Sequence, residues 1–225
     1  MSAPTRALVL MGSPKAGRGN SESLGAYLLA RLSERGVQTQ MLSVIRALRS
    51  PEATQALLEA ADGADLLILA TLLYVDSLPS GVIRALELIA ERRRAAAQAH
   101  RARFCAIINC GFPEASQNDT ALAICRRFAA EAGFEWAGGL SMGMGEAIGG
   151  RPLEKAGRML RKVRKALDVS AAALAEGQPL PEEAARLMAK PLLPPWLYML
   201  IGNMSWKRQA KKRGAGRLDA RPHEG

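Results

Sequence analysis

Residues that could bind an anion gather near the start of the chain. An apolar run ends at Met11, and a glycine-rich stretch containing Ser13, Asn20, Ser21 and Ser23 follows it. A helical spacing of leucines begins directly after this stretch. The first amides of a helix have no intrahelical acceptor and carry partial positive charge, so a strand, a polar loop and a helix N-terminus together suit a phosphate. We therefore expect phosphate binding here, with a plain polar turn and a serine cap as the alternative.

The loop completes neither of the two common nucleotide motifs. Gly12 and Gly17 have the spacing of a Walker loop, but Arg18 and Gly19 stand where that motif needs a lysine and a hydroxyl. A dinucleotide fingerprint that began at Gly17 would have Glu22 as its third glycine position. A hydroxyl-rich loop that binds a terminal monophosphate fits better than either motif.

The elements that must position this loop alternate regularly along the chain. We expect strands over residues 7–11, 37–44, 65–70, 103–109 and 134–141, and helices over 21–35, 51–63, 80–94, 118–133, 153–176 and 181–190. Asn118 or Asp119 is the expected cap of the fourth of these helices. This alternation predicts a parallel sheet in the order 2-1-3-4-5 with helices on both faces, a flavodoxin-like three-layer sandwich. The loops after strands one, three, four and five would then share one sheet edge.

Length and composition favour one α/β domain with an appendage. The chain has 225 residues, of which 48% are hydrophobic and 23% charged. We expect a ligand-binding domain over residues 1–178, with a C-terminal helical appendage and a basic tail over 179–225. No apolar run has the secretory signature or the length of about 20 residues that a membrane span needs. Three scattered cysteines predict a reduced, cytoplasmic protein without a metal site.

Much of the positive charge lies at the C-terminus. The net charge is +10, and residues 206–225 carry seven basic side chains against two acidic ones. The rest of the chain is only mildly basic, which argues against a nucleic-acid-binding core.

The loops together resemble those of the flavodoxin-like NAD(P)H-dependent oxidoreductases, a group that includes the FMN reductases. Residues 12–15 with Asn20-Ser21 are similar to the phosphate loop of that family, and residues 73–79 to its flavin-edge loop. Leu72 stands where the family usually has proline. Residues 109–114 and 143–146 resemble further loops of one branch, and the likeness extends over residues 6–175.

The resemblance implies that FMN is the cofactor and NAD(P)H the hydride donor, with a small electron acceptor. The implied phosphate ligands are Ser13, Lys15, Gly19, Asn20, Ser21, Glu22 and Ser23. The implied ring contacts are Leu73, Tyr74, Val75, Asp76, Cys110, Gly111, Phe112 and Glu114, with backbone amides of both loops facing the pyrimidine side of the ring. The flavin would carry the redox chemistry, so no catalytic side chain, metal or iron–sulfur cluster is expected. A flavodoxin-type electron carrier or a non-catalytic binding module is the alternative.

An apolar segment lies between the appendage and the basic tail. Residues 191–201 are largely apolar and proline-rich, and Trp206 follows them. So much apolar surface must be covered by the same subunit, by a second subunit or by a bilayer. We expect a homodimer in which this segment helps to close the site, with contact of the basic tail with a membrane surface as the alternative.

Overall fold

The core of the molecule is a parallel sheet of five strands in the order β2-β1-β3-β4-β5. The computed structural model describes residues 3–13, 19–96 and 101–214. The strands are β1 (Arg6–Met11), β2 (Gln38–Ser43), β3 (Leu66–Leu72), β4 (Arg103–Asn109) and β5 (Glu135–Met142). The interior strands β3 and β4 are buried almost throughout, which explains their continuous apolar sequence. The predicted sheet and its strand order are confirmed.

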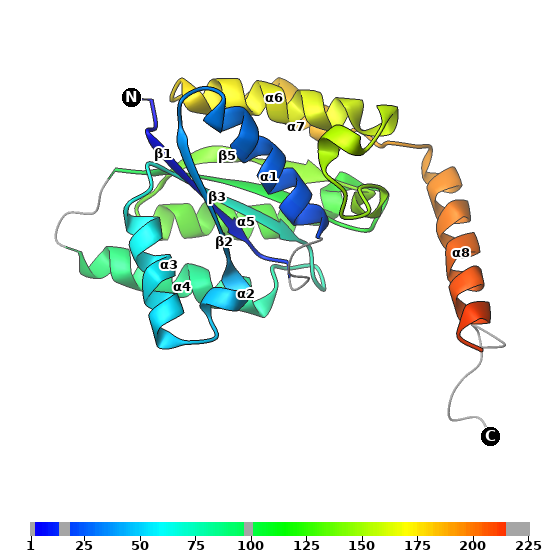
Figure 1. Cartoon of the computed structure of the whole chain (residues 1–225), viewed down its shortest axis with the longest axis horizontal. Helices are drawn as coiled ribbons and strands as arrows, with labels where there is room; N and C mark the ends of the chain where they lie inside the picture. The colour runs from blue at the N-terminus through cyan, green and yellow to red at the C-terminus, as the bar shows by residue number, and fades with distance from the viewer. Residues whose placement is uncertain (1–2, 14–18, 97–100, 215–225) are drawn as a thin grey trace.

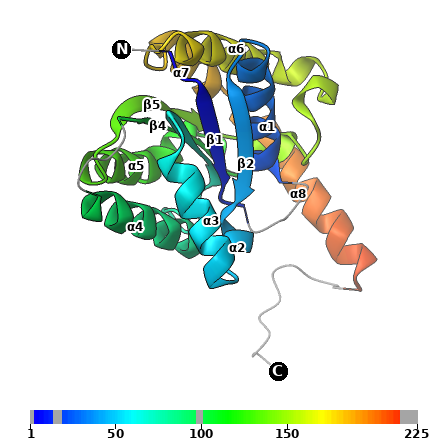
Figure 2. The ribbon, with the colours of Figure 1, turned by 60° about the vertical axis from the view of Figure 1, so that its left-hand side comes forward.

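Helices cover both faces of this sheet (Figure 1). They are α1 (Asn20–Ser33), α2 (Val44–Ala47), α3 (Pro51–Asp62), α4 (Ser80–Ala95), α5 (Asp119–Glu131), α6 (Arg161–Ala175), α7 (Glu182–Ala189) and α8 (Pro195–Lys212), with 3₁₀ turns η1 (Ala115–Asn118), η2 (Gly145–Ala147), η3 (Leu153–Lys155) and η4 (Arg158–Leu160). Alternate residues of β1 divide between two apolar cores: Val9 packs with α1, α6 and α7, whereas Leu8 and Leu10 pack with α3, α4 and α5. Figure 2 shows the two layers on either side of the strands.

Several predicted boundaries need correction. The second strand ends at Ser43, whose hydroxyl accepts from the amide of Arg46 and begins the short helix α2. The third strand continues to Leu72 because it pairs with β4 over its whole length. The expected helix over 153–176 is interrupted: Gly157 has a φ of 70°, which separates the turns η3 and η4, and regular helix begins only at Arg161.

Asn118 is not the side-chain cap that the sequence predicts. It directly precedes α5, but its side chain makes no capping bond. Its amide nitrogen instead donates to Ser141 Oγ at 2.9 Å and to the carbonyl of Met142 at 3.2 Å. This buried side chain therefore ties η1 to the end of β5.

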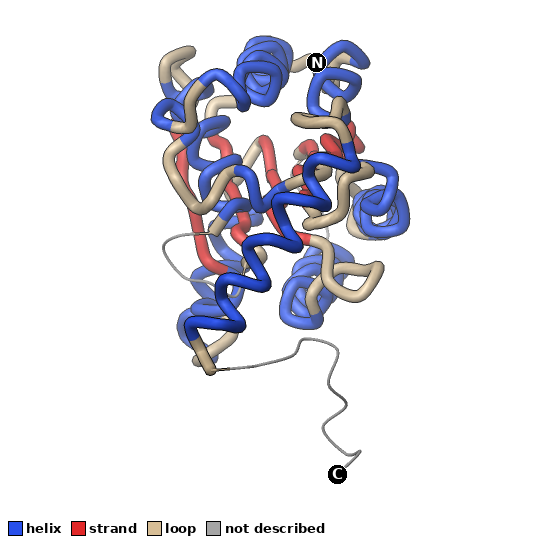
Figure 3. Tube along the Cα trace, turned by 90° about the vertical axis from the view of Figure 1, so that its right-hand side faces the viewer, coloured by secondary structure: helices blue, strands red, loops and turns tan. Residues whose placement is uncertain are grey.

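The C-terminal helices differ in how they meet the domain. Helix α7 packs against α6 and β5 and buries Ala184 and Met188 in the core. Helix α8, all of whose residues the structure describes, buries none of them. It stands off the body on the side where the strands end (Figures 1 and 3).

Candidate functional site

The carboxyl ends of four strands surround a cavity of about 400 Å³. Its walls come from the loops after β1, β3, β4 and β5 and from the first turn of α1. The lining residues are Ser13, Gly19, Asn20, Ser21, Leu72, Leu73, Asn109, Cys110, Gly111, Glu146, Gly149 and Gly150. A ligand site at this edge is expected for a doubly wound sheet, and the volume lies within the roughly 300–1,000 Å³ of ligand pockets.

The first turn of α1 forms one side of the cavity and carries donors that suit an anion. Its N-cap is Gly19, in an extended conformation, which has no side chain to satisfy the amides of the first turn. Ser13 and Ser21 lie beside it, with 3% and 2% of their surface exposed. Amides at a helix N-terminus and two buried hydroxyls are the donors that a phosphate needs.

Ser21 is held in place by a side chain from another strand. The amide nitrogen of Asn109, at the end of β4, donates to Ser21 Oγ at 2.9 Å and to the carbonyl of Thr71 at 2.9 Å. Because Ser21 accepts in this bond, its own hydroxyl proton remains available for an anion. Asn109 is not among the predicted site residues. Its place as a polar residue at the end of an apolar strand was a signal in the sequence that could have identified it.

The loop after β5 is fastened to the same helix. Asn20 Oδ1 accepts from the amide of Gly150 at 2.8 Å, so this oxygen joins two walls of the cavity. The amide of Gly145 donates to the carbonyl of Cys110 at 2.8 Å. A Cβ atom on Gly145 would lie 2.7 Å from Asn109 Oδ1, which explains why glycine stands there. Glu146, Gly149 and Gly150 also line the cavity and were not predicted.

The predicted loop after β3 divides at Leu73. Leu73 lines the cavity and donates its amide to the carbonyl of Asn109 at 2.8 Å. Tyr74 and Ser77 then exchange two backbone hydrogen bonds across a turn in which Val75 and Asp76 have φ of 47° and 56°. Tyr74 and Val75 are 63% and 82% exposed, so this turn projects into solvent beside the cavity.

The loop after β4 contributes a buried thiol and exposed neighbours. Cys110 is 4% exposed, and its Sγ lies 3.6 Å from the carbonyl oxygen of Glu114. Burial raises the pKa of the Cys110 thiol, so it stays protonated at neutral pH. Gly111 lines the cavity, whereas Phe112 and Glu114 point outward.

Two other predicted phosphate ligands that the structure describes, Glu22 and Ser23, are not among the residues that line the cavity at the strand ends. Glu22 and Ser23 line an adjoining cavity, not the one at the strand ends. Ser23 Oγ donates to the carbonyl of Gly19 at 3.3 Å, so this hydroxyl stabilises the helix start. Lys15 lies outside the described residues.

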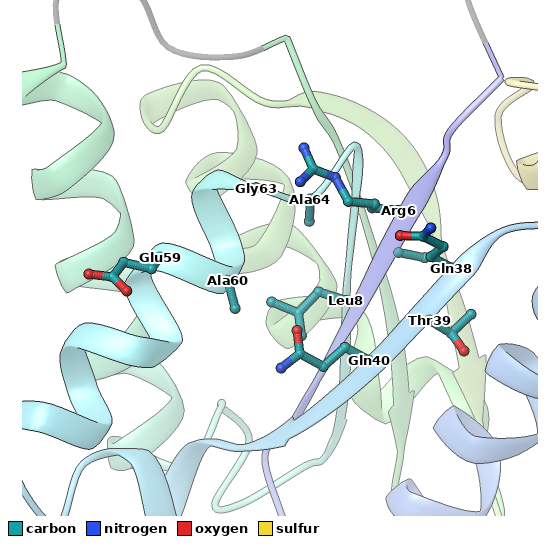
Figure 4. A pocket seen from close by; sticks show the side chains of 10 residues that line it. Arg6, Leu8, Gln38, Thr39, Gln40, Glu59, Ala60, Gly63 and Ala64 are labelled. Atoms are coloured by element: carbon teal, nitrogen blue, oxygen red, sulfur yellow. The ribbon is translucent and has the colours of Figure 1, made fainter.

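A third cavity, of about 420 Å³, lies at the opposite end of the strands (Figure 4). Arg6, Gln38, Gln40 and Glu59 are among its lining side chains. None of the predicted site residues line it, and within the described part of the chain no group of three or more His, Cys, Asp or Glu could hold a metal ion there or elsewhere.

The sheet order and the cavity at the carboxyl edge make this a flavodoxin-like protein. A family model, NADPH-dependent FMN reductase, matches residues 5–122, which is more than half of the chain. The chain therefore belongs to the NADPH-dependent FMN reductase family. Comparison with curated proteins gives no match.

Solved structures share the fold at low sequence identity. An NADH:FMN oxidoreductase in its apo form has a TM-score of 0.61 at 16% identity, with 84% of this chain and 96% of that chain covered. The structure of RosB with bound 8-demethyl-8-formylriboflavin-5′-phosphate has a TM-score of 0.57 at 13% identity, covering 98% and 92%. Rubredoxin oxygen:oxidoreductase from Desulfovibrio gigas has a TM-score of 0.54 at 10% identity, covering 82% of this chain and 38% of that longer chain.

Proposed function

We propose that this protein binds FMN at the carboxyl edge of its sheet and oxidises NAD(P)H, passing reducing equivalents to a small acceptor such as a quinone or a free flavin. The observation that carries the proposal is the cavity at the strand ends, where the glycine-capped N-terminus of α1 meets the buried hydroxyls of Ser13 and Ser21. Family membership supports the same cofactor and the same class of reaction.

The residues present fit the phosphate of FMN. The first-turn amides of α1 and the Ser21 hydroxyl would bind it, and Asn109 would orient that hydroxyl. Asn20, through its bond to Gly150, would keep the loop after β5 in place. Electrostatic attraction to the helix N-terminus adds to these hydrogen bonds.

Backbone donors for the flavin ring are limited by the hydrogen bonds already made. The amides of Leu73, Tyr74 and Cys110 donate to backbone carbonyls. Those of Gly111 and Phe112 have no backbone acceptor among the described residues. We therefore assign contacts with the pyrimidine side of the ring to these two amides, where preorganised donors stabilise negative charge on reduction.

FMN, when bound, supplies hydride acceptance at N5 and transfer to the acceptor. The protein supplies binding, orientation and exclusion of water, and no side chain needs to act as acid or base. Cys110 stays a neutral thiol beside the ring because burial raises its pKa.

The proposed flavin-binding unit is residues 1–178, and the proposed appendage is residues 179–225. Helix α7 packs on the domain, and α8 is the part that leaves it. Within the described residues no helix is both long and apolar enough to cross a bilayer. We propose a cytoplasmic location from the three unpaired cysteines, all buried.

An absorption spectrum and a turnover assay test this function. Purified protein should show flavin bands, or gain them on addition of FMN, and should oxidise NADH or NADPH when a quinone or free flavin is present. A protein without FMN affinity would contradict the proposal. Tight FMN binding without NAD(P)H turnover would instead indicate an electron carrier.

A further inference from the structure

A second cavity, of about 580 Å³, adjoins the proposed FMN site on the far side of the α1 N-terminus. The two cavities share three wall residues, Gly19, Gly149 and Gly150. Side chains from the first two turns of α1 form one wall of the second cavity, and the segment that leads from β5 into η3 forms the other. A molecule whose phosphate is bound at the start of α1 can therefore extend into either cavity.

An unpaired carboxylate oxygen marks this second cavity. Glu22 lines it, and its Oε2 is buried and has no hydrogen-bond partner among the residues that the structure describes. A buried carboxylate oxygen without a donor is costly, so a ligand with hydroxyl or amino donors would stabilise it. A phosphate would not, because the two negative charges repel each other. Glu22 is thus poorly suited to the role of phosphate ligand.

The other walls combine an apolar surface with a cation. Ala26, Tyr27, Pro152 and Leu153 are the apolar and aromatic residues that line the cavity, and Arg151 lines it as well. Tyr27 is fixed by a hydrogen bond from its hydroxyl to Asp168 Oδ1 at 2.9 Å and by the Arg31 guanidinium, 5.1 Å from its ring centroid. A rigid apolar wall, an acceptor and a cation suit, respectively, the base, the ribose and the phosphate of a nucleotide.

We propose that this second cavity binds the adenosine diphosphate end of a dinucleotide, with Glu22 accepting hydrogen bonds from the ribose hydroxyls. Acidic side chains accept from ribose hydroxyls in the same way in other dinucleotide sites. Two dinucleotides carry this group with a free 2′-hydroxyl in the chemistry proposed above: FAD in place of FMN, and NADH. NADPH has a phosphate at that position, which the Glu22 carboxylate would repel. The inference deepens the proposed function and rests on it for the identity of those two candidates.

Calorimetry on the full chain, with ADP as the probe, tests the cavity itself. ADP should bind the parent, and Glu22→Gln, which keeps the shape but removes the charge, should weaken it about tenfold or more. Loss of one ribose hydroxyl, in 2′-deoxy-ADP or 3′-deoxy-ADP, should weaken binding to the parent by a similar factor but hardly affect Glu22→Gln. A purely structural role for Glu22 would not produce this coupling.

Glu154→Gln is the matched control, since Glu154 lines the same cavity but is exposed. It removes the same charge and should leave ADP affinity within about twofold. ADP that does not bind, or that binds parent and Glu22→Gln equally, would overturn the proposal. Equal losses in Glu22→Gln and Glu154→Gln would also overturn the role of Glu22.

Comparison of FAD with FMN shows whether a flavin or a nicotinamide dinucleotide supplies the adenosine diphosphate group that this cavity binds. FAD that binds at least tenfold tighter than FMN, with the difference lost in Glu22→Gln, identifies the flavin as the source. Equal affinities, with ADP still binding to FMN-loaded protein, identify the nicotinamide dinucleotide. ADP binding without any flavin binding would preserve this inference and refute the proposed function, and FMN binding without ADP binding would do the reverse.

Discussion

At the residue scale, the proposed contact with the FMN phosphate depends on a serine that is held by a distant side-chain amide. Ser21 is almost fully buried, and Asn109 donates to it across 88 positions of sequence. The hydroxyl is therefore preorganised, and less conformational entropy is lost when it meets a phosphate.

Ser21→Asp should weaken FMN binding by one to three decades, a cost of a few kcal/mol. The aspartate can still accept from Asn109, so the network survives, but its charge repels the phosphate and the hydroxyl donor is lost. Fluorescence titration with FMN measures the affinity. Ser21→Ala separates the lost donor from the added charge, and Ser33→Asp, exposed at the other end of α1, is the matched control. Parental affinity in Ser21→Asp would place the phosphate elsewhere.

Two core cysteines should make the protein sensitive to alkali. Burial raises the pKa of the Cys105 and Cys125 thiols to about 12, from an ordinary value of 9.0. Above the ordinary value the unfolded state loses these protons while the folded state keeps them. Their contribution to stability is thus fully present below about pH 9 and is lost between about pH 9 and 12, by up to about 1.4 kcal/mol per pH unit for each thiol.

The double variant Cys105→Ala/Cys125→Ala should be less stable at pH 8, because it leaves cavities, but its free energy of unfolding should fall less steeply above pH 9. Urea unfolding under reducing conditions across pH 8 to 11 measures both slopes. Other titrating groups are common to the two proteins and cancel in the difference. Parallel slopes would show that the thiols do not contribute.

At the element scale, the turn after β3 is held in an unfavourable backbone conformation. A two-residue turn with positive φ at both central positions prefers Asn-Gly, yet this one contains Val75 and Asp76. A β-branched residue at φ of 47° is strained, and such strain often lies beside ligand sites.

Val75→Asn/Asp76→Gly should raise the free energy of unfolding by about 1–2 kcal/mol by relieving this strain. Urea unfolding of the flavin-free protein gives the value. Val75→Ala retains the positive φ without the β-branch and should gain less. If the double variant is no more stable than its parent, the turn is not a source of strain.

At the scale of the whole molecule, α8 exposes apolar surface near the site. Trp196, Met199, Leu200, Ile201, Met204 and Trp206 are each at least half exposed. The hydroxyl of Tyr198 donates to the carbonyl of Gly111 at 3.0 Å and anchors the first turn beside the cavity. Partial burial raises the pKa of Tyr198, so the phenol remains a donor at neutral pH. Among the described residues none of α8 is buried, so we propose that a second subunit or a bilayer covers its remaining apolar surface.

Removal of residues from Pro191 onward should weaken self-association, expose the flavin and lower activity. Sedimentation should show a dimer for the full chain and a monomer for the truncated one at micromolar concentration, with stronger quenching of flavin fluorescence by iodide. Leu200→Glu/Met204→Glu in the full chain should act similarly, because buried charges oppose an apolar interface.

Unchanged mass and turnover after truncation would rule out the packing role. Binding to anionic vesicles by the full chain but not by the truncated chain would favour the membrane surface, since each basic residue near it adds roughly 1 kcal/mol. Lys207, Arg208, Lys211 and Lys212 would supply that attraction.

Local sequence determined the strands, their order and the edge that holds the site. Alternation of apolar strands with amphipathic helices leaves few topologies, because crossovers between parallel strands are right-handed and each helix must cover a sheet face. The local pattern of residues is enough to locate the strand from Arg103 to Asn109 and the helix that begins at Ser80. The placement of Ser13, Asn20, Ser21, Leu73, Cys110 and Gly111 at one cavity follows from that topology.

Only the tertiary structure shows the long-range hydrogen-bond partners, the cavity that each residue lines and the position of α8. The sequence marks Asn109 as a polar end to an apolar strand, but it does not show which partners Asn109 and Asn118 bind, because those partners lie up to 88 residues away. Glu22 and Ser23 line a different cavity from Ser21, because successive residues of a helix are turned by about 100° from one another. Helix α8 could pack on the domain only where a face of the sheet is still uncovered. On the face that α1 covers in part, α6 and α7 cover the rest, so no place remains there for α8.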